Sequence, residues 1–202
     1  MNKRIGVAMA GHGLKFAPQR VCFEDESAET QLTYALSTAF GYALNREVVI
    51  VCVGTDRSTG DAFGPIIGSH LQDISPIPVY GTLENPVHAV NLTTTLDTIA
   101  RQHHGNPFIL AIDACLGRFD HVGQLIVEQG PLRPGAGVQK ALPAFGDFTL
   151  TGVVNVSGFM EYFVLQNTRL SVVMQMSNVV VRSLQTSLHR LRTMNEIARA
   201  VH

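Results

Sequence analysis

Apolar runs alternate with segments of helical periodicity along most of this chain. Two runs, "EVVIVCVG" at 47–54 and "PFILAIDA" at 107–114, are apolar at both odd and even positions and rich in β-branched residues. Strands of this composition are covered on both faces, as in parallel sheets flanked by helices. We therefore predict an α/β fold in which 47–54 and 107–114 are central parallel strands.

Weaker patterns predict the remaining elements. Ser27 is the expected N-cap of the first helix. In the last helix, apolar residues recur at three- and four-residue steps from Val172 to Met194. This stripe is interpreted as core packing, with an interface between copies of a homo-oligomer as the alternative. The other predicted strands are 77–82, 123–130 and 148–158, and the predicted helices are 27–44, 61–73, 86–103 and 159–200.

Length and composition favour one globular unit. A chain of 202 residues that is 46% hydrophobic can bury a sizeable core and lies within the range of a single domain. The first residues, up to Val21, carry no strong pattern. We predict a poorly patterned N-terminal segment, 1–21, and one α/β/α sandwich domain, 22–202, with a mainly parallel central sheet.

Charge and cysteine content narrow the classes of function. The formal net charge is −1, with 15 Lys plus Arg against 16 Asp plus Glu, which gives no electrostatic case for binding nucleic acid or an anionic membrane. No apolar run reaches the roughly 18 residues of a membrane span, and the start lacks a secretory signal pattern. The three cysteines include no CxxC pair, which argues against disulfides and a zinc clasp. We therefore expect a cytoplasmic protein.

The stretch "VCVGTDRSTGDAFGP" leads from the first central strand into a helix. In an open parallel sheet, ligands bind outside the carboxyl ends of the strands, so this turn faces the expected site. Its glycines do not form the GxGxxG motif, and no lysine follows Gly60 as a phosphate-binding Walker loop requires. What remains is Asp61 at a helix start, where free N–H groups stabilise the ionised carboxylate.

A second carboxylate is expected at the same edge. Asp113 is placed by "AIDACLG" at the carboxyl end of the other central strand. Two aspartates that share a cleft push their pKa values apart, so that one stays protonated while the other activates a water molecule. They could also bind a metal ion, and each alone could be an N-cap or a turn residue. If both face one cleft, we expect their side chains within reach of a bridging water and at least one raised pKa.

Five ordered blocks resemble one family, the sporulation protein YyaC family. This family is similar to the spore germination protease and, more remotely, to the hydrogenase maturation endopeptidases, which share a three-layer α/β/α phosphorylase/hydrolase-like fold. The resemblance runs from about Val48 to about Met176. The blocks are "VCVGTDRSTGDAFGP", "VYGTLENPVHAVNL", "AIDACLGR", "GPLRPGAGVQKALPAFGD" and "TGVVNVSGFMEYFVLQNTRLSVVM".

The resemblance implies an endopeptidase. Asp61 in "TGDAFGP" and Asp113 in "AIDA" match the essential aspartates of the germination protease, and "PGAGV" resembles its glycine-rich loop. The implied activity is sporulation-linked proteolysis of a protein or peptide substrate in the cytoplasm of a sporulating cell or forespore. The alternatives are a non-catalytic module that binds protein or an anion on a protease-like scaffold, or a metal-dependent maturation-type endopeptidase.

The metal ligands of the maturation endopeptidases are only partly present. In those enzymes nickel is bound by acidic residues that match Asp61 and Asp113 and by a histidine downstream of the second. Between Asp113 and His189 the only histidine is His121, which is too close to Asp113 to match. We therefore expect no tightly bound metal and no other cofactor. If a divalent metal binds, the expected ligands are Asp61, Asp113 and His88.

Further polar residues near the strand ends are candidates for substrate binding. Arg57 and Arg118 follow the two central strands and could bind substrate carboxylates or lower the pKa of a catalytic carboxyl, or be solvated loop residues. His88 in "NPVHAVN" follows the second strand, with Glu84 on the same face if the turn is helical. Cys115 has no evident base partner, so a buried thiol is preferred over a nucleophile.

The segment between Gly130 and Gly146 has no helix or strand pattern and is predicted to be a loop. The strand before it is placed in the parallel sheet, so the loop is expected to leave from the carboxyl edge. There Arg133 and Lys140 would bring positive charge over the aspartates. We expect this loop to form a wall or lid in which the N–H groups of Gly135 to Gly137 bind a peptide carbonyl, with a passive surface connection as the alternative.

Overall fold

The computed structural model describes residues 16–43, 46–103, 106–134 and 142–200. This part of the chain contains six strands, five α-helices and two short 3₁₀ turns. The strands are β1 Gln19–Cys22, β2 Val48–Cys52, β3 Val79–Tyr80, β4 Phe108–Gly117, β5 Gln124–Gln129 and β6 Phe148–Val156. The helices are α1 Ala28–Phe40, α2 Phe63–Ile74, α3 Leu92–Gln102, α4 Glu161–Gln166 and α5 Leu170–Ala200, and the turns are η1 Gly41–Ala43 and η2 Phe119–His121.

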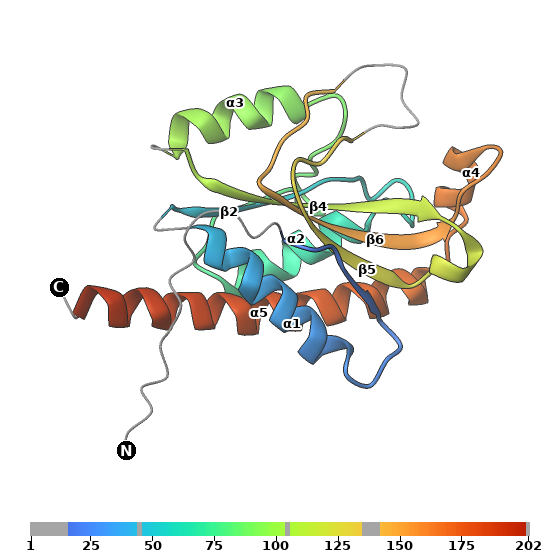
Figure 1. Ribbon diagram of the computed structural model, residues 1–202. Helices are drawn as coiled ribbons and strands as arrows, with labels where there is room; N and C mark the ends of the chain where they lie inside the picture. Colours follow the sequence, from blue (N-terminus) through green and yellow to red (C-terminus); the bar gives the residue numbers. More distant parts are fainter. Residues whose placement is uncertain (1–15, 44–45, 104–105, 135–141, 201–202) are drawn as a thin grey trace.

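The strands form one sheet in the order β1-β5-β6-β4-β2-β3 (Figure 1). β3, β2, β4 and β6 are parallel to one another, while β5 is antiparallel to both β6 and β1. The predicted α/β fold with a mainly parallel sheet is confirmed. The strands at 47–54 and 107–114 are also central and parallel as predicted, because β2 and β4 are neighbours inside the sheet.

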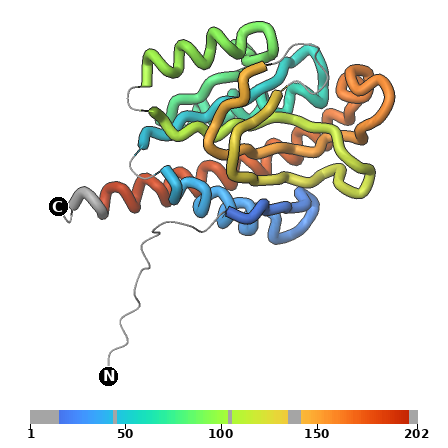
Figure 2. The backbone as a smooth tube through the Cα atoms, turned by 45° about the horizontal axis from the view of Figure 1, so that its top comes forward, coloured from blue at the N-terminus to red at the C-terminus, as the bar shows by residue number. Residues whose placement is uncertain are grey.

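Helices cover both faces of the sheet, as Figures 1 and 2 show. On one face α1, α2 and α5 enclose the larger apolar core, and on the other face α3 packs over a smaller core that contains Val49, Val51 and Ala111. Every residue of β2 is buried, which explains its unbroken apolar pattern. Most of the apolar stripe of α5 is core as interpreted, because Val173, Met176, Val180 and Leu184 are buried, whereas Met194 at its end is exposed. Among the described residues, no helix is long and apolar enough to cross a membrane.

The sheet begins earlier than the predicted domain boundary. Gln19, Arg20 and Val21 belong to β1, which pairs antiparallel with β5 at one edge of the sheet. The strand is only four residues long, and only Val21 is buried against the core. So short a segment produces no recognisable apolar alternation in the sequence.

The direction of β5 corrects the expected position of the glycine-rich loop. Gln129, the last residue of β5, lies opposite Phe148, the first residue of β6, so the loop leaves from the amino edge of the parallel strands. Leu132 and Phe145 then pair with each other and pack on the core under α3. The expectation that this loop departs beside the aspartates is therefore wrong. Gly135, Gly137 and Lys140 lie outside the described residues, while Arg133 is exposed.

Two predicted helices are shorter than their patterns. The pattern at 86–103 becomes a helix only from Leu92, because Val87 pairs with Val53 at the sheet edge. The pattern at 159–200 is divided into α4 and α5, with a break that contains the buried Thr168. In both cases a tertiary contact keeps the backbone segment out of the helix, although its apolar spacing alone predicts helix.

An ion pair at the amino edge joins three strands. Arg46 binds Asp147 through two bonds, Nη1–Oδ1 at 2.7 Å and Nη2–Oδ2 at 3.0 Å. Arg46 also donates to the carbonyl oxygen of Pro107 at 2.7 Å, and the N–H of Ile109 donates to Asp147 at 2.8 Å. The pair therefore fixes the starts of β2, β4 and β6 relative to one another.

Arg46→Met is expected to destabilise the protein by about 2 kcal/mol. It leaves a partly buried carboxylate without its bidentate partner and frees a backbone carbonyl. Urea unfolding measures the change. Arg182→Met is the matched control, because its pair with Glu29 is exposed and should contribute less than about 0.5 kcal/mol. Equal effects of the two substitutions would contradict the structural role of Arg46.

Candidate active site

Asp113 lies at the carboxyl edge of β2, although not at the end of its own strand. β2 ends at Cys52, which is opposite Ile112, so Asp113 is the first residue of β4 beyond this pairing. β4 continues to Gly117 beside β6, which makes it longer than the sequence pattern predicted. The Asp113 carboxylate therefore lies beside the point where β2 ends and its loop begins. This agrees with the expectation that the site lies at the carboxyl ends of the parallel strands.

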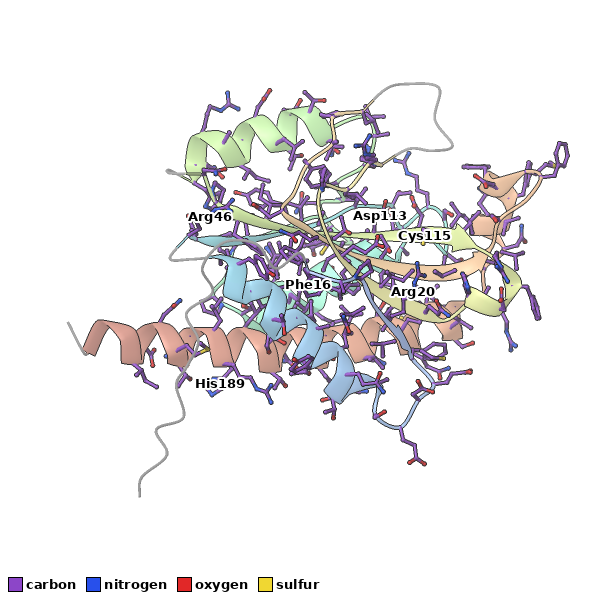
Figure 3. All side chains as sticks on the ribbon, viewed as in Figure 1. Phe16, Arg20, Arg46, Asp113, Cys115 and His189 are labelled. Atoms are coloured by element: carbon purple, nitrogen blue, oxygen red, sulfur yellow. The ribbon has the colours of Figure 1, made fainter. Side chains whose placement is uncertain are left out.

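The side chain of Asp113 faces the α3 side of the sheet. Ala111, two residues earlier, belongs to the core under α3, and side chains two residues apart share a face. In Figure 3, Asp113 and Cys115 follow each other along β4 toward the end of the sheet at which α4 lies.

A tight loop after β2 brings Asp61 to the same edge. The N–H of Thr55 donates to the carbonyl oxygen of Asp61 at 3.2 Å, which folds the loop back onto its own start. Gly54 allows this approach, because its φ of 139° is unfavourable for other residues and a Cβ there would overlap the Asp61 carbonyl oxygen. α2 begins at Phe63, so Asp61 lies just before the free N–H groups of a helix start.

Burial raises the pKa of both carboxyls. At Asp113 burial is the largest cause, the negative charge of Asp61 raises the pKa further, and the N–H of Ala114, 2.9 Å from Oδ1, opposes both. The pKa of Asp61 is raised by burial, and it is lowered in part by the Thr55 N–H and the positive charge of His88. The expected raised pKa is thus found at both aspartates. The pKa of Asp113 lies well above its usual range, so Asp113 keeps its proton to a higher pH than an ordinary carboxyl does.

The free energy of unfolding is expected to fall as pH rises through the titration of Asp113. Folding raises the pKa of this carboxyl, so between the ordinary and the raised value the folded protein binds more protons than the unfolded chain. Within that window each increase in pH favours unfolding. Asp113→Asn cannot ionise and should be more stable than the parent above the window. Urea unfolding at a series of pH values measures both effects, and a variant less stable than the parent at neutral pH would contradict them.

His88 approaches Asp61 from the loop between β3 and α3. The backbone N–H of His88 donates to Asn91 Oδ1 at 2.8 Å, and the ring nitrogen Nδ1 of His88 accepts the backbone N–H of Val90 at 3.3 Å. A neutral imidazole that accepts at Nδ1 carries its proton on Nε2. The ring therefore offers an N–H donor as well as positive charge when protonated.

The segment from Glu84 to His88 does not form a helical turn, so helical spacing is not what relates Glu84 to His88. Val87 instead pairs with Val53 beyond the end of β2 and accepts the N–H of Gly54 at 2.8 Å. This bond connects the His88 loop directly to the loop that carries Asp61. The two loops are therefore positioned relative to each other by the backbone.

A polar cavity of about 390 Å³ opens beside His88. It lies between the end of β3, the loop 81–91 and the first turn of α3, and it is large enough for side chains of a peptide but at the small end of ligand pockets. Glu84 and His88 both line it, so these two predicted binding residues share one cavity. Other polar residues of the lining are Gln72, Tyr80, Thr82, Asn85, Asn91 and Thr95.

Neither candidate arginine is among the groups that shift the pKa of Asp61 or Asp113. Arg118 binds Asp120 through two bonds of 3.1 and 2.8 Å and lowers the pKa of that exposed carboxyl. Arg57 is exposed, and the shift at Asp61 arises from burial, the Thr55 N–H and His88. The idea that these arginines lower the pKa of a catalytic carboxyl is thus wrong. Their binding of substrate carboxylates stays a prediction.

Cys115 is a protonated thiol at neutral pH. Burial, and next the negative charge of Asp113, raise its pKa to about 11, against a hydrogen bond from Thr151 that lowers it. A thiolate nucleophile would require the opposite shift. The preferred interpretation of Cys115 as an unreactive thiol agrees with this environment.

Contacts from the last third of the chain support the Asp61 loop, and sequence reasoning missed them. The N–H of Gly60 donates to the carbonyl oxygen of Leu165 in α4 at 2.9 Å. A Cβ on Gly60 would meet the side chains of Leu165 and Thr168. Asn155 of β6 donates to Thr168 Oγ1 at 3.2 Å, which fixes this turn. The only signal in the sequence was the glycine before Asp61, and nothing there identified its partner.

Three-ligand metal sites do not occur among the described residues. No three His, Cys, Asp or Glu side chains there lie close enough together to hold an ion. Asp61 interacts electrostatically with both Asp113 and His88, but the three side chains do not form a ready-made metal site. The expectation about cofactors stays a prediction.

Sequence comparisons match nearly the whole chain, including the residues of the candidate site, to known proteins. Residues 20–183 match a family described as a protein of unknown function, DUF1256. The chain is 48% identical over 186 residues to a Bacillus subtilis (strain 168) protein named "Uncharacterized protein YyaC". That alignment covers 91% of this chain and 89% of the Bacillus protein.

Proposed function

The chain belongs to the DUF1256 family, and we propose that its Asp61 and Asp113 form a carboxyl pair that hydrolyses peptide bonds. The observation that carries the proposal is the mutual arrangement of the two groups. Asp61 comes to the sheet edge from the loop after β2 and Asp113 from β4, both have raised pKa values, and the charge of Asp61 raises the pKa of Asp113. Such a pair can hold one proton between two carboxyls, because the second ionisation is unfavourable beside the first charge.

Each carboxyl has a distinct role in the proposed reaction. Asp61 is the ionised member, because the Thr55 N–H and His88 favour its charge, and it accepts a proton from a water molecule. The water oxygen adds to the peptide carbonyl carbon while Asp113 donates its proton to the carbonyl oxygen. When the C–N bond breaks, the amine takes the proton held by Asp61. Asp113 regains its own proton from the resulting hydroxyl, so both groups return to their starting states.

The neighbouring surfaces support a polymeric substrate. The His88 cavity is not lined by Asp61 or Asp113, but the Gly54–Val87 bond holds its loop against the loop that carries Asp61, and the cavity presents hydrogen-bonding groups suited to a peptide. Motif resemblance to the spore germination protease supports a role in sporulation, and we include in the proposal that the protein acts in the cytoplasm of a sporulating cell or forespore. Relationship to the hydrogenase maturation endopeptidases is part of the same proposal.

Incubation of the purified protein with a library of proteome-derived peptides tests the activity. Cleavage is detected as new termini by mass spectrometry, and we expect it to continue in the presence of EDTA. Asp97→Asn is the control, since Asp97 is an exposed residue of α3. Peptide binding without cleavage would replace the proposal by a non-catalytic binding module, and cleavage abolished by EDTA would replace it by a metal-dependent peptidase.

A further inference from the structure

Four apolar side chains around the start of α4 are exposed to solvent. Phe159 is 91% exposed, Tyr162 66%, Phe163 52% and Met160 50%. The rings of Tyr162 and Phe163 pack edge to face with centroids 5.9 Å apart. We call these four residues the α4 surface. Clusters of this kind on a soluble protein mark binding sites more often than single exposed apolar residues do.

The backbone holds this surface in a strained conformation. Met160 has φ 60° and ψ 49°, a left-handed conformation that is unfavourable for a residue with a long side chain. The N–H groups of Phe163 and Val164 donate to its carbonyl oxygen at 2.9 and 3.2 Å, which keeps the turn in place. Strain of this type persists where the surroundings enforce it, and it is common at sites that contact ligands.

The α4 surface belongs to a helix that is bonded to the loop carrying Asp61. The carboxyl end of α4 is bonded to Gly60, the residue before Asp61. Figures 1 and 2 both place α4 at the end of the sheet where β4 and β6 finish. A helix of six residues is about 9 Å long. An extended peptide spans that length in about three residues, so a chain lying in the site would reach the surface.

Other occupants fit the surface less well. Its four side chains present on the order of 500 Å², which is below the area that each partner buries in a permanent dimer. An anionic membrane requires a cluster of cations, whereas α4 contains Glu161 and the neighbouring Arg118 is paired with Asp120. A single extended segment with apolar side chains matches both the size and the charge.

We propose that the α4 surface binds apolar side chains of an extended polypeptide substrate about three residues from the bond at Asp61 and Asp113. The substrate class is then unfolded or flexible protein segments rich in aromatic and branched aliphatic residues. This inference rests on the proposed function for the position of the scissile bond. The binding preference itself does not require turnover.

Two short fluorescein-labelled peptides test the binding preference by fluorescence anisotropy. One is rich in phenylalanine and leucine, and the other has serine in their place at equal length and charge. The full-length Asp113→Asn protein is used so that no peptide is cleaved during the measurement. Combined Phe159→Ser and Phe163→Ser substitutions should weaken binding of the apolar peptide about tenfold. Tyr34→Ser on α1 is the control, because Tyr34 is 70% exposed and far along the chain from α4.

The outcomes separate this inference from the proposed peptidase. Equal affinity for both peptides, or no loss in the double variant with retained circular dichroism, would overturn the α4 surface as a substrate site. Self-association in sedimentation or binding to phosphatidylserine vesicles that the double variant abolishes would also overturn it. Tight apolar binding without any cleavage in the peptide library would support the surface and refute the peptidase. Cleavage without apolar preference near the cut bond would do the reverse.

Discussion

Asp61→Asn and Asp113→Asn are each expected to reduce peptide hydrolysis at least a hundredfold. Asp61→Asn removes the carboxylate that accepts the proton of water, and Asp113→Asn removes the acid that donates to the carbonyl oxygen. General acid or base catalysis by one positioned group contributes about 10² to 10⁴ in rate. The initial rate on a peptide identified in the library measures the loss.

Asp113→Asn should also change the free energy of unfolding. Asp113→Asn replaces a buried carboxyl whose ionisation is unfavourable, so it should lose activity while it gains stability at neutral pH. Asp97→Asn should change neither quantity, since its side chain is exposed. A single asparagine variant that retains the parent rate would exclude an obligatory pair.

Gly54→Ala is expected to destabilise the protein by about 3 kcal/mol and to disturb the position of Asp61. A Cβ at Gly54 would overlap the carbonyl oxygen of Asp61 and approach the ring of Pro65. The φ of 139° adds backbone strain, and neither problem can be relieved by a rotamer change. Urea unfolding and the initial rate of peptide cleavage are the measurements.

Gly41→Ala is the matched control for this substitution. No atom lies within 4 Å of a Cβ built at Gly41, and its φ of −58° suits any residue. This variant should keep both stability and activity. A Gly54→Ala protein as stable as the parent would show that the loop after β2 is not held against Asp61 as described.

The central part of the fold could be predicted because its pattern is set by burial on both faces. β2 is buried at every position, and the same property makes its sequence an unbroken β-branched run. The direction of β5 could not be predicted, since an apolar alternation is the same for parallel and antiparallel pairing. The glycine-rich loop was therefore expected at the carboxyl edge and is instead anchored at the amino edge.

The position of Asp113 was predicted for a reason that is only partly right. The pattern indicated that its strand ended there, but β4 continues because β6 extends beside it. Asp113 still lies at an edge, because its other neighbour β2 ends at Cys52. One strand's sequence contains no information on where its neighbour ends.

The supporting contacts of the site could not be predicted from one sequence. The bond between Gly60 and Leu165 joins residues more than a hundred positions apart, and the pairing of Val87 with Val53 depends on the sheet being assembled. The predicted helix at 86–103 included Pro86 and Val87, yet Val87 instead forms backbone pairing with Val53 at the sheet edge. Sequence reasoning therefore found the two carboxyls but not the loops that position them.

Carboxyl ¹³C NMR titration of Asp113, in the parent protein and in Asp61→Asn, tests the coupled pair most directly. In the parent, Asp113 should titrate well above the ordinary carboxyl range, because of burial and then the charge of Asp61. Removal of that charge in Asp61→Asn should lower the pKa of Asp113 while leaving it raised by burial. An Asp113 that titrates in the ordinary carboxyl range, or whose pKa is the same in both proteins, would contradict the shared site.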